Sequence, residues 1–261
     1  MGITLGVFMD KSIRLLSYFF CVLYISFSLL GNTFDRSDRS LLDPIISKLA
    51  NLCGTESLSD EKVKLIRDTA HEIGVTQQFE IRKMSALAIA QFGLYNAFVF
   101  FDYLFVSEEF FEKLDYHERR FLIGHELMHI KKKHMRQRLF LSGLLFCNEL
   151  PSRLLAYVST KFLYRNYFSS VTGMVALIRP LVVAGYTRAQ EKEADLGAAL
   201  LLCEAQGGVS LFEKMEKFAG DEHENYYAKW YNRILATHPN FQERKRYLQE
   251  IACQQEKNKQ K

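Results

Sequence analysis

Proline is scarce in this sequence, and basic side chains outnumber acidic ones only slightly. Four of the 261 residues are proline, 48% are apolar and 25% are charged. This composition excludes a collagen-like or intrinsically disordered chain, because the apolar residues are numerous enough to form a sizeable core in one domain or two small ones. The formal net charge of +4 is too small to indicate nucleic acid, and we expect no nucleic-acid partner.

Cysteine pairs with metal-binding spacing are also missing. The five cysteines are scattered over the chain, and no two of them form a C-x-x-C pair. Their spacing therefore argues against a thiolate zinc site and against a thioredoxin-like redox centre. An odd number of scattered cysteines leaves the disulfide state and the redox compartment open.

Charged residues are absent from Leu15 to Phe34, a stretch of 20 residues that is rich in aromatic and aliphatic side chains. A helix of this length can cross a hydrocarbon core of about 30 Å. We interpret residues 1–34 as a signal-anchor or transmembrane segment, with a cleaved signal peptide as the alternative. The prediction is membrane localisation through a single N-terminal anchor, with membrane lipid as a partner. Basic residues flank both ends of the stretch, so the positive-inside rule leaves the side of the membrane open.

A second apolar region spans residues 139–185, but charged residues interrupt it. Glu149, Arg153 and Arg179 lie within its two apolar segments, and a charge at the centre of a transmembrane helix costs about 2.5–3.5 kcal/mol. We therefore expect an apolar insert of amphipathic helices that pack on the core or lie at the bilayer surface. A transmembrane hairpin is the alternative.

The remaining segments predict a helix-rich domain with a small sheet. Residues 35–58 are polar and rich in turn formers and are interpreted as a linker, and residues 255–261 as a polar tail. The folded domain is expected over residues 59–254. Its β-formers concentrate at 96–100 and 103–106, which we expect to be strands, and the pattern that follows is helical. The predicted fold class is α+β and helix-dominated.

Two of the expected helices carry their own start or stop signals. An amphipathic helix that begins after Ser59 is expected to end at Gly74. Asp115 and Glu118 have the spacing of a capping box and predict the start of another helix.

The helix predicted after Asp115 carries an H-E-x-x-H motif, formed by His125, Glu126 and His129. Two histidines four residues apart lie one turn apart on the same helix face, so both imidazoles can bind one metal ion. Glu126 lies about 100° further around the helix and can reach a water molecule at the metal without being a ligand. Gly124 has no side chain, which would let another backbone approach beside His125.

A catalytic zinc ion needs a third protein ligand. A metzincin would place a histidine at the position of Met135, and His134 comes one residue too early, so this class is rejected. Glu191 is the better candidate. Thr187 and Gln190 have capping-box spacing and predict that a helix begins just before Glu191.

The helix that carries Glu191 is expected to end at Gly207-Gly208. Glu191 and Asp195 lie on a narrow face of small and acidic residues that can pack close to the histidine helix. Glu191 would present its carboxylate to the metal, and Asp195, one turn later, would hold a ligating imidazole. Glu193 points about 160° away from Glu191 and is expected to be solvated.

Taken together, the motifs resemble the HtpX-like zinc metallopeptidases, the family that includes the CAAX prenyl proteases and mitochondrial and periplasmic quality-control peptidases. Four segments match the family's pattern in order, across roughly residues 61–251. They are Asn96-Ala97-Phe98, Gly124-His125-Glu126-x-x-His129, Thr187-Arg188-x-x-Glu191-x-x-Ala194-Asp195 and His238-Pro239-x-x-x-x-Arg244.

The resemblance implies a helix-dominated zincin of the gluzincin type with a small mixed sheet, which would follow the N-terminal membrane helix predicted above. It also implies one Zn²⁺ ion per chain. It implies that His125, His129 and Glu191 are the zinc ligands and that Glu126 is the general base. The edge strand at Asn96, Ala97 and Phe98 would bind the substrate backbone. The residues that would support the ligands or stabilise the transition state are Asp195, Arg188, His238 and Arg244.

The function implied by the resemblance is that of a membrane-associated zinc metalloendopeptidase. Such an enzyme would hydrolyse peptide bonds in protein or peptide substrates, in protein quality control. The alternative is a latent or inactive membrane-tethered binding or chaperone-like protein of the same fold. Prenyl-protein processing is disfavoured, because it needs several membrane spans and this sequence has one clear span. The sequence leaves the oligomeric state open.

Overall fold

The computed structural model describes residues 39–92, 97–143, 165–219 and 239–259. The chain divides into two compact units. The first comprises Met1–Asp38 and Leu139–Ala176, and the second comprises Arg39–Arg138 and Leu177–Lys261. In the part of the chain that the structure describes, no helix is both long and apolar enough to cross a membrane.

Several predicted features fall outside the described residues. They are the anchor at 1–34, residues 144–164 of the apolar insert predicted at 139–185, and the site residues Asn96 and His238.

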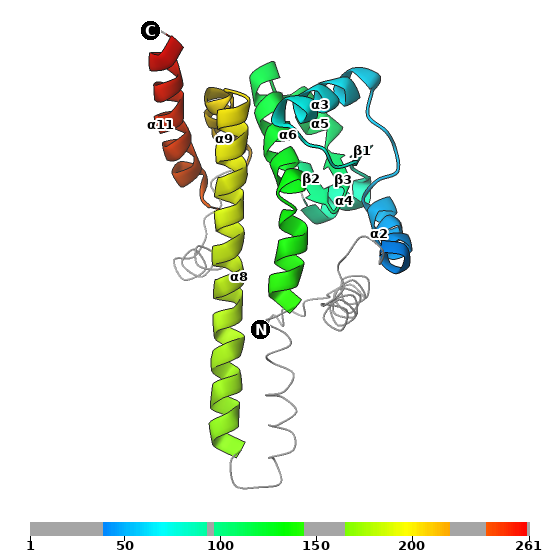
Figure 1. The fold of residues 1–261 in the computed structure, drawn as a ribbon, viewed down its shortest axis with the longest axis vertical. Helices are drawn as coiled ribbons and strands as arrows, with labels where there is room; N and C mark the ends of the chain where they lie inside the picture. Colours follow the sequence, from blue (N-terminus) through cyan, green and yellow to red (C-terminus); the bar gives the residue numbers. More distant parts are fainter. Residues whose placement is uncertain (1–38, 93–96, 144–164, 220–238, 260–261) are drawn as a thin grey trace, which may run out of the picture. The chain divides into compact units, whose positions relative to one another are not determined.

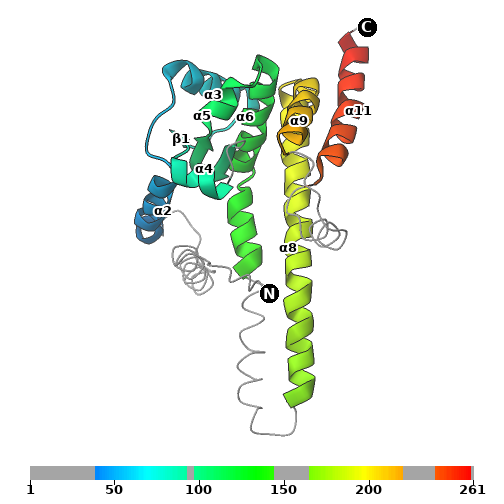
Figure 2. The same ribbon diagram turned by 180° about the vertical axis from the view of Figure 1, so that it is seen from behind.

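Helices account for most of the described residues (Figure 1), and Figure 2 shows the same ribbon from behind. They are α2 (Arg39–Cys53), α3 (Asp60–Ile73), α4 (Ala86–Phe92), α5 (Glu108–Glu112), α6 (Tyr116–Lys131), α8 (Arg165–Leu201), α9 (Ala205–Ala219) and α11 (Phe241–Lys259). With the small sheet described next, they confirm the predicted helix-dominated α+β fold.

The sheet is mixed and has the strand order β1-β3-β2. Its strands are β1 (Glu80–Lys83), β2 (Ala97–Phe100) and β3 (Tyr103–Val106). β1 runs parallel to β3, and β2 runs antiparallel to it. The two strands that the sequence predicts, β2 and β3, are confirmed to within one residue. Among the described residues, β2 pairs with β3 alone and forms one edge of the sheet.

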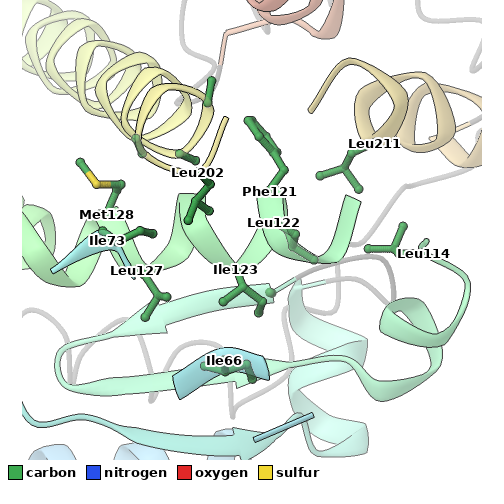
Figure 3. Packing of buried hydrophobic residues seen from close by; sticks show 14 of the residues in the cluster. Ile66, Ile73, Leu114, Phe121, Leu122, Ile123, Leu127, Met128, Leu202 and Leu211 are labelled. Carbon is green, nitrogen blue, oxygen red and sulfur yellow. The ribbon is translucent and has the colours of Figure 1, made fainter. Parts of the chain in front are cut away.

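α6 is the central helix of the second unit, and its capping box is confirmed. The Asp115 side chain accepts a hydrogen bond from the Glu118 backbone N–H, and the Glu118 side chain accepts one from the Asp115 N–H. Apolar side chains of α6 pack against α3 and the sheet on one side and against α8 and α9 on the other (Figure 3). This core contains Ile66, Ile73, Phe121, Leu122, Ile123, Leu127, Met128, Leu202 and Leu211.

The start predicted for the helix that carries Glu191 is wrong. α8 begins at Arg165 and passes without interruption through Pro180 and Thr187. Thr187 is buried, and the Gln190 side chain bonds to Gln137 and Arg138, so neither residue caps a helix end. A capping pattern is a weak local signal, and the contacts of this helix with the rest of the unit override it.

The end predicted for this helix is wrong as well. α8 ends at Leu201, and the chain turns at Cys203, whose φ is 55°. Gly207 and Gly208 lie instead within α9. A Cβ at Gly207 would lie 2.7 Å from the carbonyl oxygen of His117, so this glycine permits α9 to pack against the start of α6.

Much of the segment predicted as a linker, 35–58, forms the helix α2. Ala50 of this helix is fully buried and belongs to a small core with Met84, Ala88 and Phe105. Apolar side chains at helical spacing along α2 decide its structure, and the polar residues Asp43, Ser47, Lys48 and Asn51 lie between them.

Small residues bring α8 close to α6. A Cβ at Gly124 would lie 2.5 Å from Cδ1 of Leu202 and 3.2 Å from Cβ of Ala198. From the other helix, a Cβ at Gly197 would lie 2.9 Å from the sulfur of Met128. The close approach that Gly124 predicts is therefore made by α8, near the histidine motif.

Replacing Gly124 with valine should destabilise the protein, because the new side chain would force α8 away from α6. Overpacking of this kind typically costs about 1–3 kcal/mol, which urea unfolding can measure. Gly185→Val is the matched control, because the nearest atom to a Cβ at Gly185 is 4.0 Å away. An equal loss of stability in both variants would contradict the packing explanation.

Candidate metal centre

The two motif histidines meet on one face of α6. Their Nε2 atoms lie 3.1 Å apart, and His125 is only 7% exposed. Two imidazole lone pairs facing each other at this distance would repel, so the pair must share a proton or a cation. The H-E-x-x-H spacing thus produces the convergence that the sequence predicts.

Glu191 brings a carboxylate to the same point from α8. Its Oε2 lies 3.3 Å from Nε2 of His125, and its Oε1 lies 3.5 Å from Nε2 of His129. The ligand atoms of all three residues lie within 4.8 Å of one another. In a tetrahedral zinc site with bonds of about 2.0–2.1 Å, neighbouring ligand atoms are about 3.3 Å apart. The donor set therefore fits zinc in its chemistry and its spacing.

Charge also favours a cation at this point. Burial alone would lower the pKa of His125, but the nearby carboxylates of Asp195 and Glu191 outweigh burial and raise it to about 10. Burial, followed by the charge on His125, lowers the pKa of His129. The carboxylates thus favour one positive charge among the three donors, and a divalent metal ion satisfies the same field.

Glu126 is buried beside the donors without being one of them. Burial raises the pKa of this carboxyl to about 8, with Glu191 adding to the rise and His125 opposing it. A carboxyl that can exchange a proton near neutral pH suits a general base.

Asp195 lies behind His125, as the sequence predicts. Its Oδ1 is 2.8 Å from Nδ1 of His125, the ring nitrogen that faces away from the donors. Burial would raise the pKa of Asp195, but Arg244 and His125 outweigh it and lower the pKa to about 2. The carboxylate therefore stays ionised and can hold the imidazole in orientation.

Two residues of α11 hold Asp195 in turn. Arg244 donates two hydrogen bonds to its carboxylate, from Nε at 2.7 Å and from a terminal nitrogen at 2.6 Å, and Tyr247 donates a further one. Because Arg244 is buried and directed at Asp195, the structure places this predicted residue behind His125 rather than at the donor atoms.

Three contacting residues were not predicted from the sequence. Arg138 donates to Oε1 of Glu191 at 2.9 Å and to Gln190 at 2.6 Å. Tyr247 contacts Asp195, and His134 contacts His129. Tyr247 lies three residues after the predicted Arg244 on the same helix, and this spacing was a usable signal for it. Nothing local links Arg138 to Glu191, which lies 53 residues further along the chain.

The remaining predicted residues lie elsewhere. Arg188 is on α8, half-buried, with its guanidinium beside Gly185. Ala97 and Phe98 belong to the edge strand β2, where Ala97 is buried. Glu193 is exposed, as the sequence predicts, and its carboxylate pairs with Lys132 at 2.6 Å.

The fold and the donor set are those that the sequence predicts for a metallopeptidase of the H-E-x-x-H type. A family model described as peptidase family M48 matches residues 61–252, which is more than half of the chain. The chain belongs to peptidase family M48, whose members are typically zinc-dependent metallopeptidases. No curated protein and no solved structure matches the chain.

Glu191→Gln should lower the zinc affinity by more than the about 10–100-fold that is typical when a residue hydrogen-bonded to a metal ligand is removed. The amide is a poorer ligand and carries no charge to balance the metal. Glu213→Gln is the control, because this carboxylate is exposed on α9 and is not among the donors, and it should retain one zinc per chain in metal analysis at saturating zinc. Equal zinc binding by Glu191→Gln and Glu213→Gln would contradict the ligand assignment.

Proposed function

We propose that the chain is a membrane-associated zinc metalloendopeptidase that hydrolyses peptide bonds of protein substrates. The observation that carries the proposal is the convergence of His125, His129 and Glu191 at one point beside the buried carboxyl of Glu126. Two imidazoles and one carboxylate are a donor set of catalytic zinc, which leaves a position for water.

In this proposal the three donors hold one zinc ion and Glu126 transfers the proton. A bound zinc ion supplies Lewis acidity, which lowers the pKa of water and polarises a carbonyl group. Glu126 accepts a proton from the attacking water at its carboxylate and delivers that proton to the nitrogen of the leaving amine. The raised pKa of Glu126 supports this role, because the residue must both take up and release a proton.

The edge strand β2 is the proposed binding place for the substrate backbone. Among the described residues it pairs on one side only, and it packs near α6, which carries the histidines (Figure 1). An extended peptide can add to such an edge through main-chain hydrogen bonds, with little dependence on its sequence. Unfolded proteins offer extended, unpaired backbone, which supports a role in protein quality control.

Cleavage of an unfolded model protein such as reduced casein tests the activity. The full chain should cleave it, a zinc chelator should stop cleavage, and added zinc should restore it. Glu126→Gln should abolish cleavage while it retains one zinc per chain, because the ligands remain. Zinc-loaded protein that binds casein without cleaving it would favour the inactive binding-protein alternative.

Membrane association through residues 1–34 is the second part of the proposal, supported by the uncharged stretch from Leu15 to Phe34. The full chain should stay with membranes after alkaline carbonate extraction, whereas a chain that begins at residue 35 should be released. Extraction of both forms to the same extent would contradict an N-terminal anchor.

A further inference from the structure

His134 makes a contact with the second motif histidine that the proposed chemistry leaves unexplained. Its side chain is 1% exposed, and its Nδ1 lies 2.7 Å from Nδ1 of His129. The two rings cross at 72°, with centroids 4.8 Å apart. The contact is thus a hydrogen bond between ring edges, made on the side of His129 that faces away from the donors.

A break in the helix makes this contact geometrically achievable. In a continuous α-helix, two residues five apart differ by about 140° around the axis, so their side chains point in different directions. Here α6 ends at Lys131, and the helical backbone resumes at His134. Between them Lys133 adopts the left-handed conformation, with φ at 56°. A residue with a side chain rarely adopts this conformation, and such strain persists only where the surroundings enforce it.

The hydrogen bond also determines where the protons lie. If Nε2 of His129 faces the metal, its Nδ1 carries the proton and donates it. Nδ1 of His134 must then be the acceptor, which places the proton of His134 on its Nε2. That atom faces Oε2 of Glu193 at 3.4 Å, and Glu193 is itself paired with Lys132 at 2.6 Å.

The other two donors have comparable supports from different parts of the chain. Asp195 contacts the rear nitrogen of His125, and Arg138 donates to Glu191. His129 lacks an acidic neighbour at its rear nitrogen among the described contacts, and His134 takes that place. A neutral acceptor adds no negative charge to the centre, whereas Asp195 does.

We propose that His134 is a positioning residue that holds the ring of His129 in the orientation and tautomer needed for metal binding through Nε2, with Glu193 orienting His134 in turn. The inference rests on the proposed function, since it concerns the same zinc ligand. It adds a role for a histidine that is not a ligand and for a carboxylate that faces away from the donors.

Zinc affinity of the full chain in detergent, measured by competition with a chromophoric chelator, tests the proposal. His134→Phe keeps an aromatic ring but removes the acceptor, and it should raise the zinc dissociation constant by about 10–100-fold. His134→Asn can place its amide oxygen near the position of Nδ1 and should recover most of the affinity. His117→Phe is the control, because His117 lies on α6, the helix of His129, with 68% of its side chain exposed, and bonds to Glu204 rather than to the donors.

The absorption spectrum of the cobalt-substituted protein supplies a readout that general destabilisation would not change. The ligand-field bands should shift in His134→Phe and match the wild type in His134→Asn. Equal zinc affinity and equal spectra for His134→Phe and the wild type would overturn the role of His134. A His134→Asn variant that binds zinc as weakly as His134→Phe would overturn it as well. A wild-type chain that binds no zinc would instead overturn the proposed function.

Discussion

Gly124 of α6 and Gly197 of α8 have no side chains, and this allows the two helices to lie in contact beside the donor atoms. The side chains of Leu202, Ala198 and Met128 fill the space that larger residues at Gly124 and Gly197 would occupy. Two histidines on α6 can converge through helical spacing alone, but Glu191 reaches them only because the second helix lies this close. The polar centre therefore depends on the neighbouring apolar contact between the two helices.

The charges at the centre are tolerable because each is paired within the fold. Buried ionised groups are costly unless they are matched by opposite charges and hydrogen bonds. Asp195 has Arg244 and Tyr247 from α11, and Glu191 has Arg138. α11 thus has an electrostatic function as well as a packing one, and this accounts for the match of the family pattern extending to the C-terminal helix.

Local patterns predicted the parts of this structure that depend on neighbouring residues. The H-E-x-x-H spacing, the capping box at Asp115 and the strands β2 and β3 all follow from periodicity or short-range hydrogen bonds. The prediction that began a helix before Glu191 failed, because α8 continues through Thr187. The contacts of Arg138 and His134 were missed for a related reason: they depend on the packing of α8 and on a turn at Lys133 that no turn-forming residue announces.

The three donors come from two helices, and Glu191 follows His129 by 62 positions in the chain. An unfolded chain holds such groups far apart and cannot bind one ion with all of them. Metal occupancy and the docking of α8 on α6 are consequently linked by mass action, so that each strengthens the other. In thermodynamic terms a bound ion would act as a reversible cross-link, and the supply of zinc in the compartment would set the lifetime of the folded protein as well as its chemistry.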